Sequence, residues 1–262
     1  MNIVVCVKQV PLVGEVSIDP DTKRLRREGV ESGMNPFDLY AVEEGLRIRE
    51  RIGGRVTVMS MGPGSAEKTI REALAMGADH GILLSDPAFA GSDTWATSYI
   101  LTKAIRRFGQ VDLVLCGKQA VDGDTAQVGP GIAAHLDWPH VACVFEAVNC
   151  DNSRILVKRM QETGHSEVEL QLPALLTVVK DLNQPRVPTL KRCRAARAAQ
   201  LEIWSSRELA TTEGGIGLAG SPTRVVTTAP PPPRSGRTVC LAGTAQESAR
   251  ALLQELRMRS MI

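Results

Sequence analysis

The chain has 262 residues, a formal net charge of +2 at pH 7, and only 3% aromatic residues. A chain of this length can bury the core of one large domain or of two small ones. The nearly balanced charge gives no indication of nucleic-acid or membrane binding, and the few aromatic side chains argue against a platform on which bases would stack.

The first residues predict a strand and give no sign of a targeting segment. Residues 2–11, NIVVCVKQVP, are apolar over the length of a strand, but this run is too short for the core of a signal peptide. No stretch reaches the ~18 apolar residues that a membrane helix needs, so we expect a cytoplasmic protein. The cysteines include no CxxC pair and are expected to be free thiols. They are Cys6, Cys116, Cys143, Cys150, Cys193 and Cys240.

Strands and helices are expected to alternate over the first half of the chain. A buried strand at 2–8 and a polar surface hairpin within 14–33 come first. The alternation then continues with a helix within 35–54, a strand at 55–60, a helix at 66–78, a strand at 81–85, a helix at 92–109, a strand at 112–117 and a helix starting near Thr125. This order predicts an α/β fold, Rossmann-like, with an open, mostly parallel sheet and helices on both faces.

Capping signals mark where two of these helices begin. Asn35 suits the N-cap of the first helix, Pro36 suits its first helical position, and Asp38 adds favourable charge to the first turn. Ser92 or Asp93 is expected to cap the helix that follows the third strand.

The sequence pattern changes after residue 136. Residues 140–148, 153–160 and 167–179 are strand-like segments separated by turn residues, without helices between them. This pattern predicts an antiparallel extension of the same sheet rather than a new domain.

The last part of the chain predicts an arm. Residues 229–236, APPPPRSG, resemble a polyproline-type spacer, and a strand at 238–242 and an amphipathic helix at 245–259 follow it. A short strand and a single helix cannot bury a core alone, so the arm must dock on the chain's own body or on another subunit. We therefore expect one α/β domain over 1–220 and a C-terminal arm over 221–262.

A binding site is expected at one edge of the sheet. In an open parallel sheet, ligands bind beyond the carboxyl ends of the strands, where loops meet helix N-termini. The loops that fall at this edge are residues 8–11, 61–67, 85–93 and 117–133. The last of them, GKQAVDGDTAQVGPGIA, carries more polar groups than a plain strand-to-helix turn requires.

The helix that starts in this last loop suits a phosphate. Its N-terminus offers unpaired backbone N–H groups and the positive end of the helix dipole. Thr125 and Gln127 could add donors, while Gly123 and Gly129 allow close approach of the backbone. This pattern favours a nucleotide at the edge of the sheet.

Two aspartates complicate a phosphate site. Asp122 and Asp124 would repel a bare phosphate, so they either serve the turn and cap the helix or face ribose hydroxyls and amides. A calcium loop is disfavoured, because no third oxygen ligand or closing glutamate follows at the required spacing. The histidines lack metal-ligand spacing, so no metal site is expected at His80, His135, His140 or His165.

No catalytic residues are predicted. The sequence has no GxSxG, no GxxxxGK[ST], and no GxGxxG in the required setting. A sheet whose edge suits a nucleotide, without an evident catalytic acid, base or nucleophile, indicates a binding protein or carrier rather than a hydrolase.

Several long motifs resemble the β (small) subunit of electron transfer flavoproteins, in order and over nearly the whole chain. They are NPFDLYAVEEGLRIRE, TIREALAMGAD, DLVLCGKQAVDGDTAQVGP and LNQPRVPTL. The resemblance implies an αβ heterodimer with one FAD mainly in the α subunit and an adenine nucleotide buried in this chain. It also implies an electron carrier rather than a stand-alone enzyme, with any NADH oxidation confined to the αβ complex.

The resemblance also implies which residues hold the nucleotide. They lie at the end of the first strand, at the start of the first helix, at the end of the second strand, and in the loop over 122–133. These residues are Cys6, Asn35, Pro36, Phe37, Asp38, Met61, Asp122, Gly123, Asp124, Thr125, Ala126, Gln127, Val128 and Gly129.

The occupant implied by the resemblance is FAD. DGDTAQVGP, together with residues 88–99 and 218–225, resembles the bifurcating and nitrogen-fixation-linked members. Those members pass electrons from NADH to ferredoxin or flavodoxin and to a dehydrogenase or quinone reductase. The alternative is a housekeeping carrier with structural AMP that accepts electrons from acyl-CoA dehydrogenases. A more distant alternative, a stand-alone nucleotide-hydrolysing module, lacks its usual serine-glycine-rich loop at residues 8–11.

A recognition loop over about 181–199 is also implied by the resemblance. Leu190 occupies the position of an exposed leucine that inserts into a partner dehydrogenase. The sequence departs from the family pattern at Gln184, Val187 and Lys191, and the residues that follow are rich in arginine. These departures favour a quinone oxidoreductase over an acyl-CoA dehydrogenase as the partner.

Overall fold

The computed structural model describes residues 1–11, 32–227 and 238–262. The chain divides into two compact units, Met1–Thr227 and Thr228–Ile262. The first unit holds a large sheet with its helices, and the described part of the second holds a single helix.

Two predicted features fall outside the described residues. The strands of the hairpin within 14–33 and the polyproline spacer at 229–236 are among the residues not described. The chain on either side of the first gap does pair, because β2 (Gln9–Pro11) runs antiparallel to β3 (Ser32–Met34).

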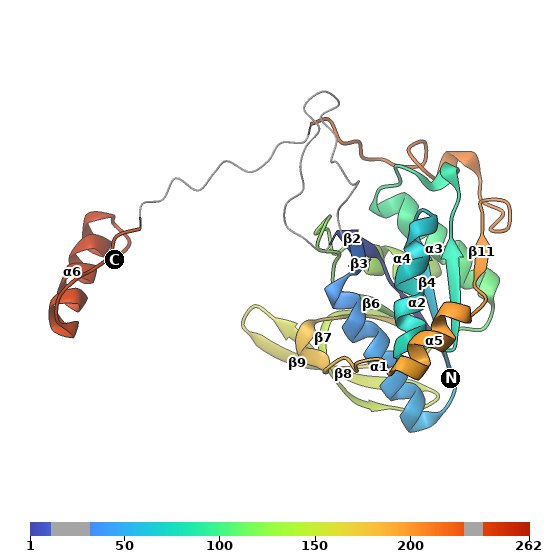
Figure 1. The fold of residues 1–262 in the computed structure, drawn as a ribbon, viewed down its shortest axis with the longest axis horizontal. Helices are drawn as coiled ribbons and strands as arrows, with labels where there is room; N and C mark the ends of the chain where they lie inside the picture. Colours follow the sequence, from blue (N-terminus) through green and yellow to red (C-terminus); the bar gives the residue numbers. More distant parts are fainter. Residues whose placement is uncertain (12–31, 228–237) are drawn as a thin grey trace. The chain divides into compact units, whose positions relative to one another are not determined.

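A nine-stranded sheet forms the centre of the first unit (Figure 1), in the order β11-β5-β4-β1-β6-β10-β7-β8-β9. The strands from β11 to β7 are parallel, and β8 and β9 continue the sheet in antiparallel pairing. The predicted mostly parallel sheet with an antiparallel extension is therefore confirmed. The strands are β1 Asn2–Cys6, β4 Arg55–Met61, β5 His80–Leu84, β6 Leu113–Gly117, β7 His140–Cys150, β8 Arg154–Gln161, β9 Gly164–Gln171, β10 Ala174–Val178 and β11 Glu202–Trp204.

One part of the predicted extension is wrong. The segment at 167–179 is not one strand, because β9 ends before Pro173 and β10 returns to lie between β6 and β7, parallel to both. Every residue of β10 is buried, whereas most residues of β9 are at least partly exposed. A continuous apolar strand suits the interior of a sheet, while a partly exposed strand suits its edge.

Helices cover both faces of the sheet (Figure 1). They are α1 Pro36–Ile52, α2 Glu67–Met76, α3 Thr94–Phe108, α4 Val128–Leu136 and α5 Leu190–Ala198, with short 3₁₀ turns at Gly64–Ala66, Pro87–Phe89, Lys180–Leu182 and Glu213–Gly215. Helix α4 begins later than Thr125, because Asp124 and Ala126 both have positive φ angles, of 53° and 55°, and keep the chain out of the helix.

Alternation along β1 shows how the sheet buries both faces. Ile3 and Val5 belong to the apolar cluster formed with α1 and α2, whereas Val4 and Cys6 belong to the cluster formed with α3 and α4. Successive side chains of a strand point to opposite faces, so each strand end presents one residue to each helix layer.

The second unit contains α6, Ala245–Met258. A capping box starts it, in which the Thr244 side chain accepts from the Glu247 N–H and the Glu247 carboxylate accepts from Thr244. The strand predicted at 238–242 is not formed in the described residues. No residue of α6 is buried within this chain. Among the described helices, none combines the length and the apolar character required to span a membrane.

Candidate functional site

The site lies at the point in the sheet where the chain changes the direction in which it adds strands. Strands β1 and β6 are neighbours, but the chain leaves β1 towards β4 on one side and leaves β6 towards β10 and β7 on the other. Loops diverge at such a point and leave a crevice beyond the strand ends. A cavity of about 560 Å³ opens there, within the range of roughly 300–1,000 Å³ found for ligand sites.

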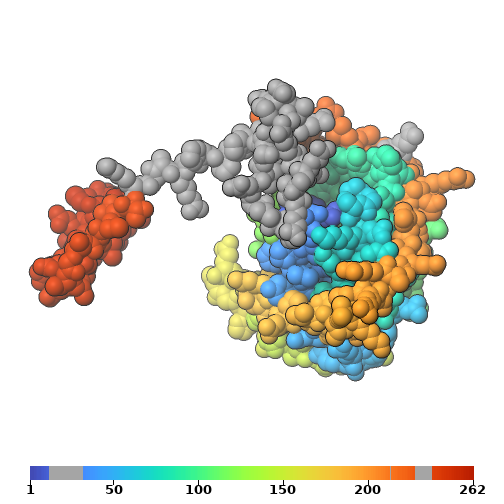
Figure 2. All heavy atoms as spheres, viewed as in Figure 1, coloured from blue at the N-terminus to red at the C-terminus, as the bar shows by residue number. Residues whose placement is uncertain are grey.

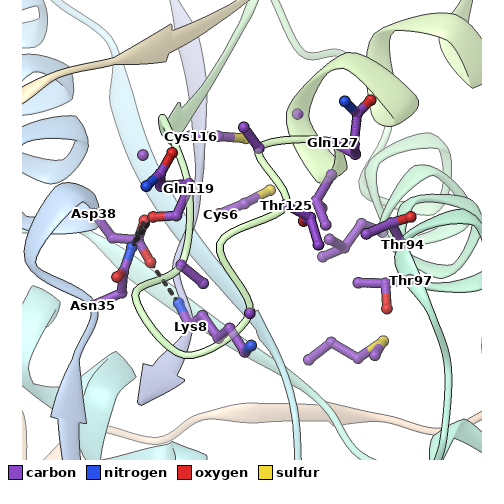
Figure 3. Close-up of a pocket in the computed structure, with 18 of the residues that line it drawn as sticks. Cys6, Lys8, Asn35, Asp38, Thr94, Thr97, Cys116, Gln119, Thr125 and Gln127 are labelled. Carbon is purple, nitrogen blue, oxygen red and sulfur yellow. Dashed lines mark hydrogen bonds between the residues drawn. The ribbon is translucent and has the colours of Figure 1, made fainter. Parts of the chain in front are cut away.

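Most of the predicted site residues line this one cavity (Figure 3). Those that do are Cys6, Asn35, Asp38, Met61, Gly123, Thr125, Ala126, Gln127, Val128 and Gly129. Pro36, Phe37, Asp122 and Asp124 are not in its lining. That the lining residues bind a nucleotide remains a prediction.

The lining also includes residues that sequence reasoning missed. Most of them follow the ends of β1 and β6 or begin α3, so position at the strand ends could have identified them. Thr223 is different, because nothing in the sequence connects it with this edge. The additional residues are Val7, Lys8, Ser92, Asp93, Thr94, Thr97, Leu101, Cys116, Gly117, Lys118, Gln119, Ala120 and Thr223.

Asn35 holds the loop that follows β6. It stands at the N-cap position of α1, as predicted, but its side chain makes no capping hydrogen bond to the helix. Its amide nitrogen donates to the Gln119 carbonyl at 2.8 Å and to the Asp38 carboxylate at 2.9 Å, and its amide oxygen accepts from the Val121 N–H at 3.1 Å. Asn35 is 1% exposed, so it ties the start of α1 to residues 119–121 from inside the fold.

Asp38 lies beneath the cavity in the first turn of α1. Its carboxylate accepts from the Asn35 amide and from the Lys8 N–H at 2.7 Å. Burial raises the pKa of Asp38 to about 7, although these hydrogen bonds act in the opposite direction. The carboxyl is therefore close to half protonated at neutral pH.

The two aspartates of the 117–133 loop do not cap α4, so the capping alternative is wrong, whereas the expected contact with an amide is present at Asp124. Asp122 accepts two hydrogen bonds from the Lys8 ammonium, at 2.7 and 2.9 Å, and Asp124 accepts one from the Gln119 amide. The aspartates therefore bind side chains from their own surroundings and stabilise the loop across the cavity mouth. Their negative charges are partly offset by Lys8, which lessens the repulsion that a phosphate would meet.

The N-terminus of α4 is left open towards the cavity. Gln127 occupies the N-cap position and makes no side-chain capping bond. Within residues 32–227, the N–H groups of Val128 and Gly129 donate no recorded hydrogen bond. A Cβ on Gly129 would lie 2.5 Å from Thr177 Cγ2, so this glycine lets α4 approach β10 closely. These backbone donors and the helix dipole are suited to an anionic group.

The N-terminus of α3 faces the same cavity but is closed by its own cap. Asp93 accepts from the Ala96 N–H at 3.1 Å and, through its other oxygen, from the N–H and the hydroxyl of Thr223 at 2.9 and 2.7 Å. The prediction that Ser92 or Asp93 caps this helix is confirmed for Asp93. The same carboxylate places Thr223 in the cavity wall.

The predicted recognition loop contains an unpredicted helix, α5, which lies along α2 (Figure 2). Leu190 is the first residue of α5 and is 71% exposed, and the nearby Val187 is 89% exposed. The segment is anchored by Arg186, whose guanidinium donates to Glu43 and Glu50 of α1 at distances from 2.6 to 3.1 Å. Arg71 donates to carbonyl groups at the end of α5.

The chemical character of the cavity suits a nucleotide. Cys6, Cys116 and Leu101 give it an apolar side for a base, while Thr94, Thr97 and Thr125 add hydroxyl groups near the helix N-termini. In the described part of the chain, no cluster of three or more histidine, cysteine, aspartate or glutamate side chains could hold a metal ion.

Comparison with known proteins shows similarity over the whole length of the chain. Residues 22–209 match the electron transfer flavoprotein domain. The chain is 48% identical to electron transfer flavoprotein subunit beta of Thermoanaerobacterium thermosaccharolyticum over 263 aligned residues, with all of both chains covered. It is 44% identical to caffeyl-CoA reductase-Etf complex subunit CarD of Acetobacterium woodii, again with full coverage of both. It is also 44% identical to protein FixA of Azotobacter vinelandii, over 90% of this chain and 86% of the relative.

Proposed function

The chain belongs to the electron transfer flavoprotein family, and from this premise we propose that it is the small subunit of an αβ heterodimer and holds FAD in the cavity beside β1 and β6. The observation that carries the proposal is the open N-terminus of α4, where Val128 and Gly129 line a cavity of about 560 Å³ and their N–H groups have no partner among the residues that the structure describes. These donors fit the diphosphate of the cofactor, and the side formed by Cys6 and Leu101 fits its adenine.

The chain's own residues supply position and shape. Asn35 fixes the loop after β6, and Asp38 fixes the backbone of Lys8 after β1. The Lys8 ammonium balances the charge of Asp122 in that loop, and Asp93 holds Thr223 against the cavity. When bound, FAD supplies the ability to accept a hydride and to give up electrons singly, which no amino-acid side chain here can do.

We propose NADH as the electron donor, with ferredoxin or flavodoxin and a dehydrogenase or quinone reductase as the two acceptors. A second FAD would lie mainly in the α subunit. The similarity to a subunit of a caffeyl-CoA reductase-Etf complex supports a reductase of a CoA ester as one class of partner, and the similarity to FixA supports the bifurcating branch. The exposed Leu190 and Val187 offer the surface on which such a partner would dock.

Cofactor content per heterodimer tests the proposal. The purified αβ complex is denatured, and the released FAD and AMP are separated by chromatography and counted against protein. Two FAD and no AMP are expected. One FAD and one AMP would instead assign the chain to the housekeeping carriers with structural AMP. ATP turnover by the chain without its partner would contradict the carrier function altogether.

A further inference from the structure

Two buried thiols share one side of the cavity. Cys6 ends β1 and is paired in register with Cys116 of the neighbouring β6. Both residues line the cavity, both belong to the apolar cluster on the α3 and α4 side, and neither forms a disulfide. Figure 3 shows their side chains together at the carboxyl ends of the two strands. Neighbouring strands lie about 4.8 Å apart, so the two sulfur atoms are close neighbours.

The chemistry of this pair limits what it can bind. Two effects raise the pKa of Cys116 well above its ordinary value: the larger is a hydrogen bond with Cys6, and the smaller is burial. Cys116 therefore stays protonated at neutral pH and reacts slowly with alkylating reagents, which require a thiolate. A direct disulfide needs Cβ atoms about 3.5–4.5 Å apart, less than the spacing of in-register strands. One larger atom that bonds to both sulfurs spans this gap better.

We propose that Cys6 and Cys116 form a dithiol site for trivalent arsenicals, and that a nucleotide in the cavity covers it. With an arylarsenoxide, two arsenic–sulfur bonds form and the arsenic–oxygen bond breaks. The oxygen leaves as water with the two thiol protons, and arsenic remains trivalent, so no oxidant or reductant is needed. The dithiol site follows from the positions of the two thiols, and only the statement that a nucleotide covers them rests on the proposed function. The remaining free cysteines lie outside this cavity lining: Cys143, Cys150, Cys193 and Cys240.

Phenylarsine oxide tests the site directly. The full chain, in its αβ complex and freed of nucleotide, is treated with the reagent, and the intact mass of this chain is measured. One adduct is expected that resists excess 2-mercaptoethanol and is removed by 2,3-dimercaptopropanol, because only a dithiol competes with two thiols held together. Cys6→Ala and Cys116→Ala should each abolish the resistant adduct, whereas Cys193→Ala should retain it.

A second measurement keeps the test valid if either alanine variant fails to fold. Proteolysis of the wild-type adduct should release Cys6 and Cys116 in one arsenic-bridged pair of peptides. A resistant adduct that persists in Cys116→Ala, a bridge between other cysteines, or no adduct on the wild-type chain would overturn the dithiol site.

Nucleotide protection tests the covering separately. Saturating FAD or AMP is expected to slow formation of the adduct at least tenfold, with nucleotide binding measured independently by equilibrium dialysis. If nucleotide binds without protecting the thiols, the covering is wrong. If the adduct forms but no nucleotide binds, the dithiol site stands and the proposed function fails.

Discussion

Helix α1 supports two regions, the cavity and the segment around α5, and these regions present different chemical groups to a ligand. Its first turn holds the loop of the cavity through Asn35 and Asp38, and its outer face holds the recognition segment through Glu43 and Glu50. Both regions are therefore fixed at their base by polar contacts with the same helix. At the cavity the free groups are backbone N–H donors, whereas around α5 they are large apolar side chains.

This difference indicates the kind of ligand that each region takes. Unpaired N–H groups in a concave site favour a small anionic ligand, because these donors lose little hydrogen-bond free energy when a phosphate oxygen replaces water as the acceptor. Exposed Val187 and Leu190 gain from burial against another apolar surface, which only a macromolecule offers over that area. Helix α1 thus supports a cavity suited to a small anion and an exposed apolar surface, two regions that are chemically unlike.

Among changes at the cavity and around α5, loss of the Arg186 guanidinium should have the largest effect on stability. Arg186→Ala removes the guanidinium that faces Glu43, whose side chain is only 4% exposed. Removing one partner of a buried ion pair costs roughly 3–5 kcal/mol, and we expect the lower end because Arg47 still contacts Glu43. Chemical denaturation measures the free energy of unfolding.

Arg194→Ala is the matched control for this change, since Arg194 lies on α5, is exposed, and forms no ion pair among the described residues. It should change the unfolding free energy by less than about 0.5 kcal/mol. Nucleotide affinity should persist in both variants, because the cavity is held by the other end of α1. A drop in nucleotide affinity confined to Arg186→Ala would show that the two regions are coupled.

The carboxylates of α1 should respond to pH in opposite ways. The pKa of Glu43 lies below its ordinary value because contacts with Arg186 outweigh burial, whereas burial raises the pKa of Asp38 to about 7. An unfolded aspartate titrates near 3.9, so between about 4 and 7 the folded chain binds the additional proton at Asp38. The stability that Asp38 contributes therefore falls as the pH rises through this range and levels off about one pH unit above the folded pKa.

Denaturation curves between pH 5 and 8 measure this effect. At about 1.4 kcal/mol per pH unit, roughly 2–3 kcal/mol should be lost from pH 5 to pH 7. Asp38→Asn should flatten that part of the profile. Asp93→Asn should leave it unchanged, since the pKa of Asp93 is lowered by hydrogen bonds from Thr223 and Ala96 that outweigh burial. An unchanged profile in Asp38→Asn would show that another group titrates.

Closing the gap between α4 and β10 should weaken the cofactor site. In Gly129→Ala the new Cβ would lie 2.5 Å from Thr177 Cγ2, so the start of α4 must shift. We expect a loss of about 1–2 kcal/mol in unfolding free energy, although alanine is the better helix former, and about tenfold weaker nucleotide binding. Gly214→Ala is the control, because Gly214 lies outside the cavity lining and its Cβ would meet nothing within 4 Å. Equal effects of the two changes would argue against α4 as the phosphate site.

The fold could largely be predicted from local patterns, and the exceptions have a common cause. The first four parallel strands are contiguous apolar runs, and the helices between them carry their own start and stop signals. The place of β10 could not be read in this way, since its position between β6 and β7 depends on pairing with residues distant in the chain. The helix of α5 was missed because its polar sequence has almost no buried face, and Arg71 stabilises its end from α2.

The position of the site could be predicted better than the roles of its side chains. Strand ends located the cavity, because parallel strands bring their carboxyl ends to one edge. Asn35 resembled a cap, and the aspartates of the loop after β6 resembled caps or sugar ligands. Asn35 and Asp122 instead bind partners far away in the sequence, Gln119 and Lys8, whereas Asp124 binds Gln119 of its own loop. Asp93 holds Thr223 at the cavity, and no local sequence pattern predicts that contact.

The smallest effect on stability is expected at the tip of the recognition segment. Leu190 is 71% exposed, so Leu190→Ala should lower the unfolding free energy by less than about 0.5 kcal/mol. The fully buried Leu46 of α1 is the matched contrast, where the same change should cost about 2–5 kcal/mol. Electron transfer to the partner dehydrogenase or quinone reductase should nevertheless fall in Leu190→Ala, while cofactor content stays the same. If Leu190→Ala instead destabilised the chain by more than about 1 kcal/mol, the Leu190 side chain would pack against its own subunit. The segment around α5 would then not expose an apolar surface to a partner, and the contrast with the cavity would fail.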